Sequence, residues 1–210
     1  LIGFGQSGVD VMWSQGGGTF RDPVTVLQGD FSNDAGWRKK FDERMLIDFD
    51  NDGLLDLVGF GVGGTYVALN TSDIGRPAFA PMRNVLEKFG SNLWQKRRFS
   101  LNGVHDNRVM RKFDDVNGDG NLDIVGIRGN GVFVSLNDGN GGFLPVNRYH
   151  SGVRQVGPSA SDSYVSGTVP YYVYAPTLTA DFTGDGKADF FSFTNTGVTF
   201  WQAPLIGTFQ

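Results

Sequence analysis

The sequence contains no cysteine and only two histidines among its 210 residues. The absence of cysteine excludes disulfide bonds and thiol catalysis, and it leaves a metal site only carboxylate, carbonyl or imidazole ligands. Cations that prefer oxygen ligands are therefore the natural candidates. The sequence also has no run of about 18 apolar residues and no basic stretch followed by an apolar one, so it predicts neither a membrane span nor an uncleaved signal peptide.

Basic residues are few and scattered. The formal net charge is −4, and only Arg38-Lys39-Lys40 and Lys96-Arg97-Arg98 bring cations together. No continuous phosphate-binding face is predicted, so we expect no nucleic-acid partner. By contrast, 31 glycines separate short runs of β-branched and aromatic residues, and apolar residues make up 40% of the chain. This composition is typical of a folded all-β protein with many tight turns.

A nine-residue acidic segment occurs three times in the chain. The copies read DFDNDGLLD at 48–56, DVNGDGNLD at 115–123 and DFTGDGKAD at 181–189, at spacings of 67 and 66 residues. An apolar strand, a glycine-bearing turn and a second strand follow each copy, which predicts three hairpins. The chain opens with a fourth hairpin of this kind that lacks the acidic segment, and in this alignment Leu1 corresponds to Leu57.

Additional strands would complete each repeat. We expect them at 19–24 and 79–82, after hairpins, and at 44–47, before the first acidic segment. Four short strands per repeat form the blade of a β-propeller, which closes with about four to eight blades. The predicted fold is therefore an all-β propeller of four-stranded blades, with residues 1–210 as a single region. The repeat units are 1–56, 57–123, 124–189 and a partial unit at 190–210.

The region amounts to about three and a half blades. A blade cannot bury both of its faces alone, so a closed ring needs more blades than these. We therefore expect either a piece of a longer chain or a protomer that another copy completes.

The acidic segments predict calcium-binding loops. Positions one, three and five point oxygen ligands inward, the glycine at position six allows a sharp turn, position seven offers its carbonyl, and position nine can close the shell. The predicted ligands are Asp48, Asp50, Asp52, Leu54 and Asp56 in the first loop, Asp115, Asn117, Asp119, Asn121 and Asp123 in the second, and Asp181, Thr183, Asp185, Lys187 and Asp189 in the third. Six to eight oxygens suit calcium better than magnesium, so we expect Ca²⁺ at about three sites.

Each acidic segment could instead be a polar turn that caps a hairpin without an ion, but three copies in one register favour the metal. The segments lack the glutamate at position twelve and the flanking helices of an EF-hand, which predicts a structural staple rather than a switch. The ten loop carboxylates would repel one another without a cation. Position three changes from Asp50 to Asn117 to Thr183, so we expect affinity to fall from the first loop to the third.

The acidic segments, together with the strand Leu57-Val58-Gly59-Phe60-Gly61, resemble the FG-GAP or VCBS blades of integrin α-subunit propellers. Gly36-Trp37-Arg38 and the run from Asn137 to Phe143 are similar to the Psathyrella velutina-type lectin family. This second resemblance implies a seven-bladed fungal propeller with calcium in its loops, which binds N-acetylglucosamine and sialylated glycans between adjacent blades. In that family a histidine and an arginine follow the Gly-Trp-Arg segment, whereas here Asp42 and Arg44 occupy those places.

The candidate sugar-binding residues are Trp37, Arg38, Asp42, Trp94 and His105. A lectin needs an aromatic face that stacks on the sugar ring and a few fixed polar groups that bind its hydroxyls, in a shallow preformed pocket. The alternative for the two tryptophans is packing between blades. The alternative for the histidine is an ordinary loop residue.

The predicted function is a calcium-stabilised lectin whose partners are glycans or glycoproteins. We expect no enzyme, because the residue types present offer no nucleophile paired with a base. A non-catalytic propeller module of a larger carbohydrate-active enzyme and an integrin-like protein-adhesion module remain alternatives. The sequon Asn70-Thr71-Ser72 adds slight weight to a secreted or extracellular protein, where millimolar calcium would fill weak loops.

Overall fold

The computed structural model describes the chain except for residues 39–41, 92–109, 129–130, 151–176, 195–196 and 204–210. Two compact units divide the chain, residues 1–95 and residues 96–210, and each is described by itself. The described residues form strands, turns and loops. Among them, no helix is long and apolar enough to cross a membrane.

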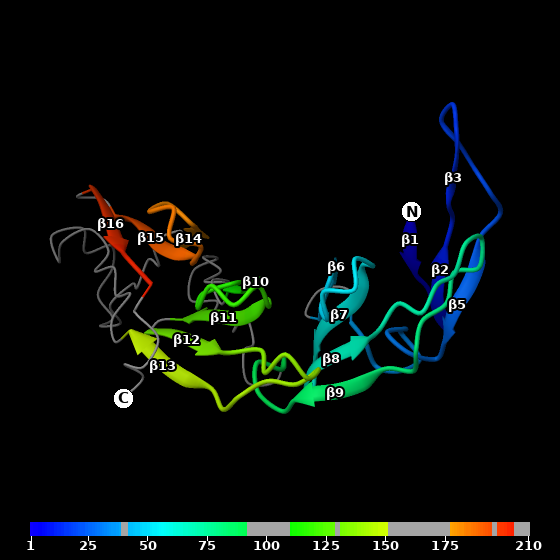
Figure 1. Cartoon of the computed structure of the whole chain (residues 1–210). Coiled ribbons are helices and arrows are strands. Elements are labelled where there is room, and N and C mark those ends of the chain that lie inside the picture. The colour runs from blue at the N-terminus through cyan, green and yellow to red at the C-terminus, as the bar shows by residue number, and fades with distance from the viewer. Residues whose placement is uncertain (39–41, 92–109, 129–130, 151–176, 195–196, 204–210) are drawn as a thin grey trace, which may run out of the picture. The chain divides into compact units, whose positions relative to one another are not determined.

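The first unit consists of short antiparallel strands (Figure 1). They are β1 (Ile2–Phe4), β2 (Gly8–Val11), β3 (Ser14–Gly16), β4 (Thr19–Phe20), β5 (Val24–Gln28), β6 (Glu43–Ile47), β7 (Asp56–Gly61), β8 (Gly64–Ala68) and β9 (Arg83–Leu86). β1, β2 and β5 form a three-stranded sheet, and β6 to β9 form a four-stranded sheet in chain order. The strands β3 and β4 pair as a separate hairpin.

The second unit repeats this plan. Its strands are β10 (Met110–Asp114), β11 (Asp123–Arg128), β12 (Gly131–Ser135), β13 (Asn147–His150), β14 (Thr177–Ala180), β15 (Asp189–Thr194) and β16 (Gly197–Trp201). β10 to β13 form a four-stranded sheet and β14 to β16 a three-stranded one, both in chain order. In the described residues, the repeat sheets therefore hold three, four, four and three strands, which agrees with the predicted three and a half blades.

Two of the strands expected between the hairpins were placed wrongly. Residues 79–82 are not a strand, because Phe79 makes only an isolated bridge to Asn70 and the outer strand of this sheet is β9 at Arg83–Leu86. Residues 19–24 are split between β4, which pairs with β3, and β5, which completes the first sheet. Both regions contain a proline, which has no amide hydrogen to donate to a ladder and therefore displaces the strand along the chain.

Tryptophan packing explains the glycines of β7. A Cβ atom on Gly59 would lie 2.7 Å from the Trp37 ring, and one on Gly61 would lie 3.1 Å from it. Trp37 is 5% exposed, and its ring centre lies 4.6 Å from that of Phe31 and 5.6 Å from that of Tyr66. These contacts belong to the core between the first two sheets. Only a residue without a side chain lets the indole approach the strand this closely.

The second unit has its own core between the sheets β10–β13 and β14–β16. Val125, Ile127, Val132 and Val134 from one sheet pack with Phe190 from the other, and each is at most 5% exposed. The backbone amide of Ala188 also donates to the carbonyl of Asp115 at 2.7 Å. Each sheet in this pair therefore uses one face to cover its neighbour.

Candidate metal centre

Each acidic segment links the first strand of a sheet to the second, and the three have the same backbone shape. In every loop the fourth and sixth residues adopt left-handed backbone conformations. These residues are Asn51 and Gly53, Gly118 and Gly120, and Gly184 and Gly186, with φ between 59° and 86°. Glycine enters this region without strain and asparagine tolerates it better than most residues, which accounts for the residue types at both positions.

Local hydrogen bonds hold the loops in this shape. The first aspartate of each loop accepts the backbone amide of the sixth residue, at 3.1, 2.9 and 2.9 Å in chain order. The fifth aspartate accepts the amide of the seventh residue, which is Leu54, Asn121 or Lys187, at 2.8, 2.8 and 3.0 Å. Short side chains that bond to nearby amides stabilise such turns without any helix or ladder.

The ninth aspartate fixes each loop to its sheet. Asp56 is fully buried, and its carboxylate accepts the amides of Phe49 at 2.8 Å and Asn70 at 2.7 Å. Asp123 is fully buried too, and it accepts the amides of Val116 at 3.0 Å and Asn137 at 2.8 Å. This position therefore ties the loop to the end of the third strand in each sheet.

Asp189 accepts the two equivalent hydrogen bonds and two more. Its carboxylate accepts the amides of Phe182 at 3.1 Å and Ala203 at 2.9 Å, and also the amide and hydroxyl of Thr183 at 3.1 and 3.2 Å. The third loop thus surrounds its ninth carboxylate with more donors than the other two loops do.

These environments shift the ninth aspartates in different directions. Burial raises the pKa of Asp56, and the charges of Asp50 and Asp52 add to the rise, against the hydrogen bonds that lower it. Burial raises the pKa of Asp123 to about 7. Burial acts in the same direction on Asp189, but its hydrogen bonds prevail and its pKa is lowered. A cation beside Asp56 or Asp123 would relieve the cost of their buried charge.

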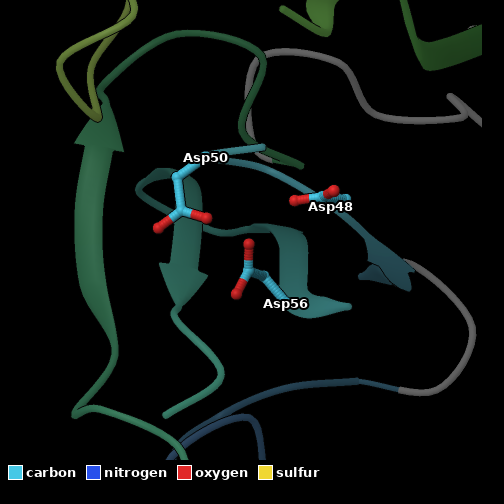
Figure 2. A group of neighbouring side chains, drawn as sticks. All are labelled: Asp48, Asp50 and Asp56. Atoms are coloured by element: carbon cyan, nitrogen blue, oxygen red, sulfur yellow. The ribbon is translucent and has the colours of Figure 1, made fainter. Parts of the chain in front are cut away.

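The first loop gathers three carboxylates. Oxygen atoms of Asp48, Asp50 and Asp56 all lie within 4.8 Å of one another, and Figure 2 shows these side chains grouped where β6 leads into β7. Among the described residues no hydrogen-bond partner reaches Oδ1 of Asp48, although this atom is buried. An oxygen-only donor set with an orphaned buried oxygen fits a calcium ion.

The second and third loops use their third residue differently. The Asn117 side chain donates to Asp119 at 2.8 Å, and the Thr183 hydroxyl donates to Asp189. In the third loop Oδ2 of Asp185 also accepts the side chain of Gln202 at 3.3 Å. In the part of the chain that the structure describes, the cluster of three close carboxylates occurs in the first loop.

The Lys187 side chain belongs to the third loop but lies against Gly118 of the second loop. A Cβ atom on Gly118 would be 3.1 Å from Cγ of Lys187 and 3.6 Å from its Cε. The next residue, Ala188, is bonded through its amide to the carbonyl of Asp115 in the same second loop. The two loops of this unit are therefore neighbours, and the lysine stem crosses from one to the other.

The sugar-binding candidates separate into two groups. Trp94 and His105 lie outside the described residues. For Trp37 the geometry supports the packing alternative, because a ring that is 5% exposed has no open face to offer a sugar. Arg38 keeps an accessible side chain at 45% exposure, and Asp42 lies buried beneath it.

Asp42 holds the arginine in place. Its carboxylate accepts the Arg38 backbone amide at 2.6 Å and two guanidinium nitrogens at 3.2 Å each. Burial acts to raise the pKa of Asp42, but the hydrogen bonds from Arg38 and Ser91 lower it overall. Ser91 also accepts a guanidinium hydrogen at 3.1 Å. Sequence reasoning missed Ser91 because 53 residues separate it from Arg38 and no motif marks it.

Comparison with known proteins identifies the repeat. A family model described as an FG-GAP-like repeat matches residues 115–192, which include the second and third loops. Within these residues the chain is similar to an FG-GAP-like repeat. No curated protein sequence matches it.

One solved structure extends the similarity beyond the matched FG-GAP-like repeat. It is a lectin from Agrocybe aegerita, described as specific for non-reducing terminal N-acetylglucosamine, with 32% sequence identity and a TM-score of 0.76. The match covers 100% of this chain and 47% of the lectin, so the chain spans about half the length of that relative. The predicted fold, all-β with propeller blades of the FG-GAP type, is confirmed.

Proposed function

We propose that this chain is a calcium-stabilised lectin without catalytic activity, which binds glycans that end in N-acetylglucosamine or a related sugar. The observation that supports this most is the similarity of the whole chain to the Agrocybe aegerita lectin, at 32% identity. The partners on this proposal are extracellular glycans or glycoproteins. The same environment supplies calcium at millimolar concentration.

Arg38 is the residue we propose to bind sugar hydroxyls. Three hydrogen bonds to Asp42 fix the position of its backbone and guanidinium, while the side chain stays 45% exposed. A donor that is fixed before binding loses little conformational entropy when the ligand arrives. Asp42 then acts as a positioning residue, and Trp37 supports the pair from within the core.

Calcium, on this proposal, is held most tightly by the first loop. Asp48, Asp50 and Asp56 supply the carboxylates, and the orphaned Oδ1 of Asp48 is the atom that gains most from a cation. A bound divalent ion would neutralise these charges and stabilise the folded loop by mass action. The stapled loop in turn supports the sheet β6–β9, which packs against Trp37.

A glycan array read with and without EDTA tests the proposal. We expect binding to glycans with terminal N-acetylglucosamine, and its loss when calcium is chelated. Arg38→Ala should weaken binding at least about tenfold, since hydrogen bonds from charged groups contribute about 1.5–3 kcal/mol. Arg21→Ala removes the same charge from an exposed residue elsewhere and should leave binding unchanged. An array without any glycan signal, from a protein that is folded in calcium, would refute the lectin assignment.

A further inference from the structure

Asn70, the asparagine of the sequon Asn70-Thr71-Ser72, lies against the first acidic loop. Its backbone amide donates to Oδ1 of Asp56, the ninth residue of that loop, at 2.7 Å. Its side-chain nitrogen, Nδ2, donates to the carbonyl oxygen of Leu55 at 3.0 Å, and its side-chain oxygen accepts the amide of Ser72 at 3.0 Å. The asparagine side chain therefore uses both its nitrogen and its oxygen within the protein.

The next repeat has an asparagine at the same position but no sequon. This residue is Asn137, 67 residues later, and the residue two places after it is Gly139 rather than serine or threonine. The Asn137 amide donates to Asp123 at 2.8 Å, its Nδ2 donates to the Leu122 carbonyl at 3.4 Å, and its side-chain oxygen accepts the amide of Gly139 at 3.0 Å. Asn70 makes the same three contacts, so its place in the repeat is explained by the loop and not by a glycan.

The serine of the sequon is engaged as well. The Ser72 hydroxyl accepts the amide of Ala78 at 3.0 Å and donates to the carbonyl of the same residue at 3.3 Å. Asn70 also forms an isolated bridge with Phe79. Asn70 and Ser72 are both half-buried. The sequon is thus part of a closed turn, whereas a glycan acceptor is expected on an exposed surface loop.

We propose that the Asn70 side chain holds the first acidic loop closed and that the sequon carries no glycan. A glycan on Nδ2 would replace one of its hydrogens with a sugar ring, at a nitrogen that lies 3.0 Å from the Leu55 carbonyl. Because Leu55 directly precedes Asp56, loss of this hydrogen bond should loosen the loop where its ninth carboxylate meets the sheet. The closing of the loop needs no metal, whereas any effect of Asn70 on calcium binding rests on the proposed function.

Hydrogen exchange in EDTA tests the role of Asn70 in the loop. The probe is the backbone amide of Phe49, which donates to Asp56 at 2.8 Å. Asn70→Ala should make this amide exchange about fivefold faster, because a neutral hydrogen bond is lost. Ser72→Ala removes the sequon but keeps the asparagine side chain, so it should leave the rate unchanged. Asn84→Ala is the matched control, since the Asn84 side chain also bonds to two backbone groups but does not contact the loop.

Two outcomes of the exchange experiment would contradict the role of Asn70. One is an unchanged rate in Asn70→Ala, and the other is an equal acceleration by Ser72→Ala. Terbium titrations separate this role from the calcium proposal, because Asn70→Ala should also weaken binding at the first loop about fivefold. If the wild-type protein binds no terbium while the exchange result holds, the calcium proposal fails and the closing of the loop by Asn70 stands.

Intact mass of the secreted protein tests the sequon. The chain is secreted from a eukaryotic cell behind a cleavable signal sequence, and its mass is measured before and after treatment with peptide N-glycosidase. Gly17→Asn is the control, because it completes a sequon with Gly18 and Thr19 in an exposed turn. There φ is 61° and a Cβ atom would meet no other atom within 4 Å. We expect a glycan to be released from Gly17→Asn and none from the wild-type protein. A glycan on Asn70 of the folded, secreted protein would overturn the proposal.

Discussion

The first and third acidic loops share a backbone but satisfy their carboxylates in different ways. In the first loop, Asp48, Asp50 and Asp56 converge and one buried oxygen of Asp48 lacks a partner among the described residues. In the third loop, Thr183 replaces the third aspartate and directs both its amide and its hydroxyl to Asp189. The pKa of the ninth aspartate is raised in the first case and lowered in the second. We propose that the first loop depends on a cation, whereas the third loop surrounds its ninth carboxylate with hydrogen-bond donors.

On this proposal, one sequence pattern encodes two degrees of dependence on metal. A carboxylate surrounded by amide and hydroxyl donors is stable as an anion in a buried place. A carboxylate beside other carboxylates becomes stable only when a proton or a cation joins it. At the third position the first loop has Asp50 and the third loop has Thr183, whose hydroxyl is one of the donors to Asp189.

The largest expected effect comes from removing the ninth aspartate in either loop. Asp56→Ala should lower the free energy of unfolding by about 3 kcal/mol in calcium. In EDTA the loss should be only about 1 kcal/mol, because the mutation then also removes a buried charge that no cation compensates. Asp189→Ala should cost about 3 kcal/mol in both, since its four donors lose their partner with or without metal. Urea unfolding in the two buffers measures this. Equal costs for Asp56→Ala in calcium and in EDTA would contradict the comparison.

Chelation should destabilise the first loop more than the third. A ligand present at about 100 times its dissociation constant stabilises the folded state by about 2.7 kcal/mol. The melting temperature should therefore fall in EDTA and recover in millimolar calcium, with a smaller recovery in magnesium. An unchanged melting temperature in all three buffers would refute the proposal that calcium stabilises the protein.

Graded withdrawal of calcium should empty the loops in a fixed order. Ligand charge decreases from Asp50 to Asn117 to Thr183, so occupancy should be lost first from the third loop, then from the second, and last from the first. Anomalous-scattering occupancies from crystals soaked in increasing chelator measure the order. A third site that empties last would show that loop rigidity outweighs charge.

Thr183→Asp should convert the third loop towards the first. The added carboxylate should strengthen calcium binding at this loop about tenfold. The same change should lower stability in EDTA, because a hydroxyl that donated to Asp189 becomes a second negative charge. Asp50→Thr is the reciprocal variant and should weaken the first loop. Terbium luminescence titrations measure both changes. An unaltered affinity in both variants would show that the charge at position three does not set the metal affinity of these loops.

The smallest expected effect concerns Lys187. Its stem lies against Gly118, so Lys187→Gln should strengthen calcium binding at the second loop about twofold by removing a nearby positive charge. Lys88→Gln makes the same charge change in the first unit and is the control. Calcium titrations of the two variants compare the same charge change at two positions. An equal rise in the affinity of the second loop in both variants would mean that net charge alone is responsible.

Local features of the sequence were sufficient for much of this structure. The repeated acidic segments, the hairpins that follow them and the antiparallel pairing depend on neighbouring residues, because glycine, asparagine and aspartate set turns and alternation sets faces. The prediction of β6 at 44–47 agrees with Glu43–Ile47 for this reason. Spacing alone also placed Asp56, Asp123 and Asp189 at equivalent positions.

Contacts between distant residues decided the rest. Trp37 is a core residue because Gly59 and Gly61 leave room for its ring, and Ser91 reaches Arg38 from 53 residues away. Likewise, Val116, Val132 and Val134 are buried against Phe190, whereas the residues 66 positions later, Phe182, Val198 and Phe200, are exposed. The sequence by itself determined the repeat and its turns, since these are short-range. Burial, side-chain direction and loop charge balance were decided by the tertiary structure, since they depend on which surfaces meet.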